Sequence, residues 1–122
     1  MGRQSTGKYR HFSRADRVAD LIMREVGTFL LTKINDPRIG FATVVKVKVS
    51  PDLRLSRIYV SVMGDEQRKR EAMMGLVSAT GYVQKAMAGK LGLRFTPKVT
   101  FYLDESMDYA ERINAMLKEL NE

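Results

Sequence analysis

Residues 79–97 read ATGYVQKAMAGKLGLRFTP, and the fold of the chain is best worked out from this stretch. Apolar residues recur at helical spacing before and after Gly81, which predicts two amphipathic helical segments. Gly81 costs a helix interior about 1 kcal/mol relative to Ala and follows the β-branched Thr80, so we expect the helix to kink or break there. A break would expose the backbone N–H groups of a helix start. The sequence Gly89-Lys90-Leu91-Gly92 then predicts a helix end.

The stretch lies in a segment, residues 72–103, that contains no Asp or Glu but has four cations: Lys85, Lys90, Arg94 and Lys98. A helix start with free N–H groups and uncompensated cations is suited to binding a phosphate. The segment is therefore a candidate phosphate-binding site. The alternative is a kinked core helix whose lysines are simply solvated.

The composition of the 122-residue chain indicates a polyanionic partner. It has 21 Lys and Arg against 14 Asp and Glu, a formal net charge of +7 and a pI of about 9.9. Residues 104–122 hold six acidic and two basic residues, so the excess positive charge precedes them. We expect residues 13–122 to form a single domain and residues 1–12, which are polar, basic and aperiodic, to form a flexible arm.

Several classes of protein and site are excluded or disfavoured. The absence of cysteine excludes a disulfide framework, a thiolate zinc site and a cysteine nucleophile. No apolar run is long enough to span a membrane or resembles a signal peptide, so a cytoplasmic protein without membrane contact is expected. The one histidine, His11, has no partner at catalytic spacing, and no Walker-type loop occurs. We expect no enzyme, cofactor or metal site; acids at a helix start explain Asp104, Glu105 and Asp108 more simply than Mg²⁺ does.

The segment before residue 41 predicts one helix and a turn. Ser13 followed by Asp16 is typical of an N-cap, and apolar residues then keep helical spacing to about Lys33. Arg14 and Arg17 lie near its start. Residues 35–40, NDPRIG, have the Asp-Pro and Gly chemistry of a turn and include Arg38.

Alternating apolar residues predict three strands. Residues 43–49 alternate Val45, Val47 and Val49 with lysines, and residues 57–62 form a second strand after the turn at residues 50–52. Because the link is so short, these two strands should form an antiparallel hairpin. Residues 98–103 give a third strand, and an amphipathic helix follows Ser106.

The resulting order is α-β-β-α-kink-α-β with a C-terminal helix, which predicts an α+β fold of two layers, with helices on the apolar face of a three-stranded sheet. The other face should stay open. The residues predicted on this face are Lys46, Lys48, Arg57, Tyr59, Lys98 and Tyr102. Such cations and tyrosines are suited to bind phosphates and stacked bases, and the alternative is an ordinary hydrated outer face.

This order resembles the type II KH fold (αββααβ), whose Gly-x-x-Gly turn holds nucleic-acid phosphates. The sequence Gly89-Lys90-Leu91-Gly92 matches the Gly-x-x-Gly pattern, but it lies just before the third strand and leaves no room for the helix that must follow the turn. The position where the turn is expected holds Ala79-Thr80-Gly81 instead. That Ala-x-Gly turn resembles the ribosome-binding factor A family. The agreement covers roughly residues 14–120: Arg14-x-x-Arg17-Val18-Ala19, Asp36-Pro37-Arg38, Val49-Ser50-x-Asp52-Leu53, Tyr59-Val60-Ser61, Ala79-Thr80-Gly81-Tyr82, Leu91-x-Leu93-Arg94 and Pro97-x-Val99-x-Phe101-x-x-Asp104-x-Ser106.

The resemblance implies a bacterial factor that binds the immature small ribosomal subunit (30S), assists late maturation and processing of 16S rRNA, matters most in the cold and leaves through a GTPase. The basic arm is longer than the family leads us to expect, and the charged C-terminal tail of some members is missing. A monomer is expected. The RNA-binding residues would be Ala79 and Gly81 at the turn, with Lys85, Lys90, Arg94, Arg14, Arg17, Arg38, Lys46 and Lys48.

Two other functions remain open at this point. A general single-strand nucleic-acid binder of KH type would bind arbitrary RNA or DNA, although Ala79 restricts the backbone where such a loop needs glycine. A protein-interaction module that docks on a ribosomal protein or a GTPase would use its charge only to steer the encounter. Binding to protein-free rRNA would distinguish the second of these from an RNA-binding factor.

Overall fold

The computed structural model describes residues 13–32, 36–40 and 42–121; the predicted arm at residues 1–12 lies outside them. The described residues form a mixed α and β fold with three α-helices, one short 3₁₀ helix and one three-stranded sheet. The elements follow one another as α1 (Arg14–Thr32), the 3₁₀ helix η2 (Pro37–Ile39), β1 (Ala42–Val49), β2 (Leu55–Val62), α2 (Glu66–Leu91), β3 (Lys98–Leu103) and α3 (Ser106–Asn121).

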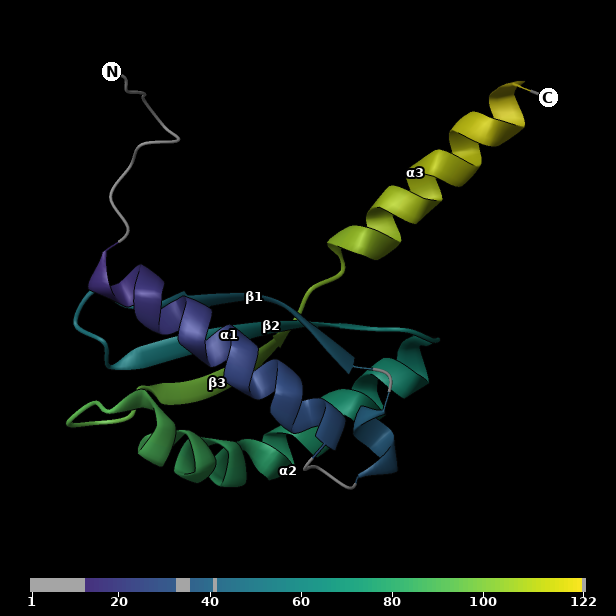
Figure 1. The fold of residues 1–122 in the computed structure, drawn as a ribbon. Helices are drawn as coiled ribbons and strands as arrows, with labels where there is room; N and C mark the ends of the chain where they lie inside the picture. The colour runs from purple at the N-terminus through teal and green to yellow at the C-terminus, as the bar shows by residue number, and fades with distance from the viewer. Residues whose placement is uncertain (1–12, 33–35, 41, 122) are drawn as a thin grey trace, which may run out of the picture.

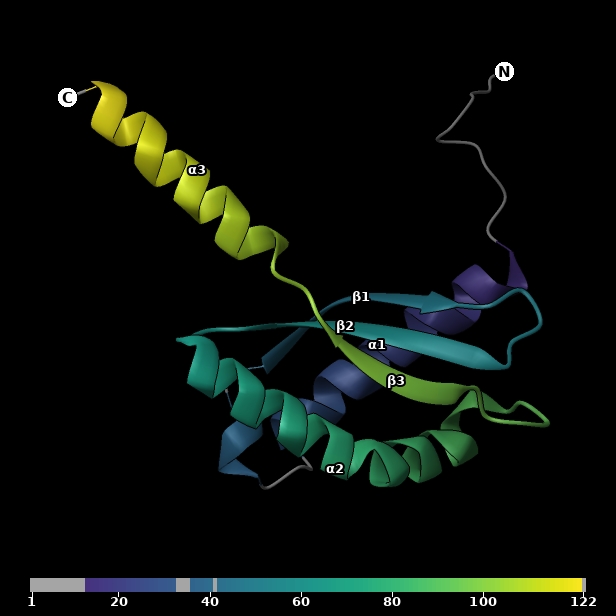
Figure 2. The same ribbon diagram turned by 180° about the vertical axis from the view of Figure 1, so that it is seen from behind.

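The sheet has the strand order β1-β2-β3. The β1–β2 pair is antiparallel, which confirms the predicted hairpin, and β2 and β3 are parallel. Parallel neighbours need a long crossover connection, and α2 supplies it. Figure 1 shows α1 and α2 on one face of the sheet, and Figure 2 shows the opposite face with no helix over it. We call the sheet with α1, η2 and α2 the body of the molecule.

Local chemistry fixes the helix ends, including the N-cap at Ser13 that the sequence predicted. The amide of Asp16 donates to Ser13 Oγ at 3.1 Å, and the amide of Ser13 donates to a carboxylate oxygen of Asp16 at 3.1 Å, which is a reciprocal N-cap. Asp65 caps α2 by accepting from the amide of Arg68 at 2.9 Å. At the other end, Gly92 takes a left-handed conformation (φ 64°) that suits glycine, so the predicted helix end is confirmed.

Of the kink or break predicted at Gly81, the break is wrong, because α2 is one continuous helix from Glu66 to Leu91, and the kink is not confirmed. Buried side chains on both sides of Gly81, such as Leu76 and Val83, anchor both halves to the same core. Their burial outweighs the roughly 1 kcal/mol cost of one glycine. Thr80 Oγ1 donates to the Leu76 carbonyl at 2.9 Å, a bond that bends helices without interrupting them. The backbone N–H groups near Gly81 therefore belong to a helix interior and are not an anion site.

Two of the three glycines of α2, Gly75 and Gly81, predict opposite effects of substitution by alanine. A Cβ at residue 75 would lie 2.9 Å from Cγ1 of the buried Ile39, whereas a Cβ at residue 81 would meet nothing within 4 Å. Gly75→Ala should lower the free energy of unfolding by about 1–2 kcal/mol, because overpacking exceeds the helix-propensity gain. Gly81→Ala should raise it by about 0.5–1 kcal/mol. Urea unfolding of both variants checks this, and destabilisation by Gly81→Ala would contradict a continuous helix.

The alternation in β1 differs from the prediction at one residue. The register between β1 and β2 shifts between Val44 and Lys46, which marks a β-bulge. Val44 and Val47 therefore pack against the core, while Val45, predicted to face inward, is 37% exposed. The bulge leaves Lys46 and Lys48 exposed, as expected.

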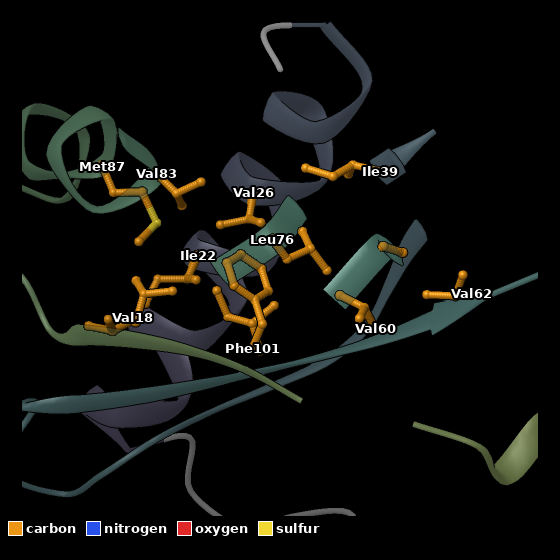
Figure 3. Packing of buried hydrophobic residues seen from close by; sticks show 13 residues of the cluster. Val18, Ile22, Val26, Ile39, Val60, Val62, Leu76, Val83, Met87 and Phe101 are labelled. Atoms are coloured by element: carbon orange, nitrogen blue, oxygen red, sulfur yellow. The ribbon is translucent and has the colours of Figure 1, made fainter. Parts of the chain in front are cut away.

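One core lies between the helices and the sheet, and Figure 3 shows its packing. α1 contributes Val18, Ile22 and Val26, η2 contributes Ile39, and α2 contributes Leu76, Val83 and Met87 among others. The side chains of β2 and β3 that point toward the helices form the other side of this core. α2 also binds the sheet through Gln84 Oε1, which accepts from the amide of Val99 at 3.1 Å.

α3 projects away from the body (Figures 1 and 2). Its predicted apolar side is not buried in this structure, since Ile113, Met116, Leu117 and Leu120 are all exposed. Glu105, which directly precedes α3, forms an ion pair with α2: its carboxylate oxygen lies 3.6 Å from Lys69 Nζ.

Candidate nucleic-acid interface

The outer side of α2 carries the largest group of predicted site residues. Gly81 and Lys85 are exposed, one helical turn apart, with Ser78 and Ala88 continuing the same stripe. Lys85 has no ion pair with any residue that the structure describes. Ala79 is only partly exposed. Small side chains around one cation leave space for a polyanion backbone to approach the helix closely.

Lys90, another predicted contact, is partly engaged within the protein. Its Nζ lies 3.8 Å from a carboxylate oxygen of Glu25 on α1. The two residues stand at the edge of a groove of about 330 Å³ between α1 and α2, which Phe29 and Tyr82 also line. These two rings meet edge to face, with centroids 5.2 Å apart. The Lys90 side chain is 66% exposed, so its ammonium group can also reach a phosphate beside this carboxylate.

The contacts between the helices place further cations at one end of the body. Phe29 meets Tyr82 and Glu25 meets Lys90, so α1 and α2 run in opposite directions and α1 begins near the end of α2. Figures 1 and 2 show the start of α1, the β1–β2 turn and the loop after α2 at this same end. The predicted residues of this end are exposed: Arg14, Arg17 and Arg94. The guanidinium carbon of Arg94 lies 5.6 Å from the ring centroid of the exposed Phe95.

Arg38 does not join this group. It belongs to η2, which packs beside the first half of α2, at the opposite end of the body in Figure 1. Its Nη2 lies 2.7 Å from Asp36 Oδ2, and its Nε also donates to that carboxylate. This hydrogen bonding lowers the pKa of Asp36 and raises the pKa of Arg38. Arg38 therefore lies apart from Lys85, with its guanidinium bonded to Asp36, and its contact with RNA stays a prediction.

Lys46 and Lys48 lie on the open face of the sheet, away from α1 and α2. The outward positions of the three strands also carry Arg57 and Lys98, and they include no acidic residue. None of these four cations has an ion pair within the described part of the chain. The predicted site residues thus form two surfaces on opposite faces, which meet at the end where α1 and β3 begin.

Two carboxylates next to the open face, Asp104 and Asp52, accept hydrogen bonds from residues close by in the chain. Hydrogen bonds from the Ser106 hydroxyl and amide lower the pKa of Asp104, with a smaller contribution from the charge of Lys46. Bonds from Ser50 and the Arg54 amide lower the pKa of Asp52 in the hairpin turn. Among residues 13–32, 36–40 and 42–121, no three His, Cys, Asp or Glu side chains come together as metal ligands. No helix in these ranges is long and apolar enough to cross a bilayer.

Sequence reasoning missed how the aromatic residues of the open face are arranged. Tyr59 pairs with Lys46 on one side and with Tyr102 on the other, forming one row across the sheet. Period-two alternation places each residue on a face, but it does not reveal which strands are neighbours. The pairing of β2 with β3 could not be read from the sequence pattern.

The family comparison is decisive for the class of protein. A family model described as ribosome-binding factor A matches residues 14–117, from the start of α1 into α3. The chain belongs to the ribosome-binding factor A family. The region matched includes the Ala79-x-Gly81 sequence that first suggested the resemblance.

Solved structures of ribosome-binding factor A share this fold. The crystal structure of the Thermus thermophilus protein aligns with a TM-score of 0.67 and 22% identity, covering 75% of this chain and 97% of that one. The solution NMR structure of a Thermotoga maritima protein described as a ribosome binding factor A aligns with a TM-score of 0.70 and 27% identity, covering 80% and 93%. A Thermus thermophilus model fitted into a map of a 30S–RbfA complex aligns with a TM-score of 0.63 and 22% identity, covering 76% and 97%.

Proposed function

We propose that this chain binds the immature small ribosomal subunit as a monomeric, non-enzymatic factor of the cytoplasm and assists the late maturation and processing of 16S rRNA. The observation that carries the proposal is the match of the ribosome-binding factor A family to residues 14–117. The Thermus thermophilus relative that was fitted into a 30S complex supports the choice of subunit. We also propose that the factor matters most in the cold and that an assembly GTPase releases it from the subunit.

The surface proposed for rRNA is the outer side of α2 with the adjoining end of the body. Lys85 and Arg94 would bind phosphates first, since both are exposed and neither has an ion pair among the described residues. Arg14 and Arg17 would extend the contact along the start of α1. Lys90 would join by reaching a phosphate beside Glu25.

In the proposed mechanism, the cations of this surface bind the phosphates of one rRNA conformation and so stabilise it over the others. Because residues 72–103 contain no Asp or Glu, this part of α2 presents no carboxylate of its own to rRNA, and Glu25 of α1 stands beside Lys90. We propose that this fold is related to the type II KH fold by the order of its helices and strands, with the continuous α2 in place of two helices. Because phosphates would be held by side chains and not by a glycine turn, binding would favour one rRNA shape over another without reading its sequence.

Co-sedimentation tests the proposal. The purified protein is centrifuged with immature and mature small subunits, large subunits and whole ribosomes at near-physiological salt. Selective pelleting with the small subunit is expected. Equal pelleting with every particle, abolished by modest salt, would overturn the family function and leave a basic domain with general affinity for RNA.

The exposed apolar side of α3 favours a second candidate, a module that contacts a ribosomal protein. Ile113, Met116, Leu117 and Leu120 lie on one side of this helix and are exposed. Such a face is suited to pack on another protein. Binding to protein-free 16S rRNA distinguishes the candidates, because a protein-docking module would not bind it specifically.

A further inference from the structure

The open face of the sheet contains a preformed aromatic stack at its centre. The rings of Tyr59 and Tyr102, on neighbouring parallel strands, lie with centroids 5.5 Å apart and an interplanar angle of 26°. Lys46 Nζ lies 4.6 Å from the centroid of Tyr59. Tyr59 therefore has contacts with Lys46 and with Tyr102, its partners in the two neighbouring strands.

The stack ends at the edge of the sheet. β3 is the last strand, and Tyr102 is 40% exposed. Within the described residues, Tyr59 is the only ring or cation stacked on Tyr102. An aromatic ring that is already held in place loses little conformational entropy when a further flat group stacks on it. Its outer surface is thus ready for one more ring.

The charges around the stack point to the kind of ring. Lys46 lies beside Tyr59, and Lys48, Arg57 and Lys98 follow at outward positions toward one end of the sheet. The strands carry no acidic residue, and Asp104, just beyond β3, is hydrogen-bonded by Ser106. Lys48 and Arg57 are direct cross-strand neighbours, although like charges placed opposite each other destabilise a sheet. A polyanion that carries flat aromatic groups would relieve this repulsion and use the stack. Single-stranded RNA has both features.

We propose that the open sheet face binds a single-stranded segment of RNA, with one unpaired base stacked on Tyr102 and the adjacent phosphates on Lys98, Arg57 and Lys48. This inference rests on the proposed function, which makes rRNA the partner, and adds a second contact surface to it. Lys98 begins β3 at the end of the body where Arg14 and Arg94 also lie. One RNA could therefore pass from α2 around this end to the sheet.

The alternative is that the stack only stabilises the sheet, since aromatic cross-strand pairs contribute to stability. An abasic oligonucleotide separates the two, because it keeps the phosphates and lacks the bases. The probes are a ten-nucleotide oligouridylate and its abasic counterpart. The chain has no tryptophan, so tyrosine fluorescence can be followed, and quenching that is lost in Tyr102→Leu reports stacking at Tyr102 among the five tyrosines.

The base-bearing oligonucleotide should bind more tightly than the abasic one and quench tyrosine fluorescence. Tyr102→Ala should weaken binding of the base-bearing oligonucleotide by about five- to a hundredfold, the range for losing one base–aromatic stack. Its affinity for the abasic oligonucleotide should not change. Tyr102→Phe should keep the wild-type affinity, and Tyr102→Leu, which keeps an apolar side chain on the strand, should bind like Tyr102→Ala.

Two results would overturn the inference: equal affinity of the wild-type protein for both oligonucleotides, or equal losses with both in Tyr102→Ala. If the wild-type protein still pelleted selectively with small subunits, the proposed function would stand without the stacking site. If the protein pelleted with all particles alike but lost base-dependent binding in Tyr102→Ala, the stacking site would stand and the proposed function would fail.

Discussion

Reversing two charges on the helical side, Lys85→Glu with Arg94→Glu, should weaken binding to the small subunit by about a hundredfold. Hydrogen bonds to charged groups contribute about 1.5–3 kcal/mol each, so the loss of two exceeds the effect of any single neutral contact. Both residues are exposed, and neither touches the buried core. The fold should therefore survive, which circular dichroism checks alongside the affinity measured by filter binding.

A matched variant separates a specific surface from general electrostatics. Arg70→Glu with Lys118→Glu changes the net charge by the same amount, and both residues are exposed outside the proposed contact. We expect this variant to lose at most a few-fold in affinity. Equal losses in the two variants would show that only the total charge matters and that the helical side is not the site.

The salt dependence of binding gives an independent count of the contacts. If about six phosphates are engaged, the logarithm of the affinity should fall with the logarithm of the salt concentration with a slope of about −4 for single-stranded RNA. Losing two of them should bring the slope to about −3. An unchanged slope in the Lys85→Glu, Arg94→Glu variant would mean that these residues meet no phosphate.

Leu76→Ala should lower the free energy of unfolding by about 3–4 kcal/mol. Leu76 is fully buried between α1 and the sheet, and large-to-small substitutions at such sites combine lost burial with a cavity. A loss of this size is a large part of the roughly 5–15 kcal/mol that holds a small protein folded. Urea unfolding of the protein at about 25 °C measures it.

The neighbouring residue provides the control. Val77 follows Leu76 directly, yet its side chain is 66% exposed on the outer side of α2. Val77→Ala should change the stability by less than about 0.5 kcal/mol. Comparable losses at both positions would mean that α2 is rotated about its axis relative to the packing described here.

The sequence predicted the strands and the helix ends well, because local chemistry decides them. The Ser13 cap and the helix end at Gly92 depend on residues close by in the chain, and the alternation of β2 reflects burial on one face only. The break at Gly81 was predicted wrongly because helix propensity is a weak term. Leu76 and Val83, on either side, bury enough surface to keep the helix intact.

The candidate site was predicted only in part. The acid-free segment at residues 72–103 identified Lys85 and Arg94 without any structure. The bidentate bond of Arg38 to Asp36 was not predicted, because it depends on the geometry of η2, which spacing alone does not give. The Tyr59–Tyr102 stack depends on strand order, which long-range packing decides.

The most direct test of the central claim, that the outer side of the second half of α2 faces 16S rRNA, is photo-crosslinking from a single cysteine. The chain has no cysteine, so Ser78→Cys in that half and Gln67→Cys, on the same side of α2 but in its first turn, can each carry one benzophenone group. Both residues are exposed. With immature small subunits, we predict a cross-link to 16S rRNA from residue 78 and none from residue 67. Cross-links to rRNA from residue 67 alone, or from residue 78 only to ribosomal protein, would contradict the account.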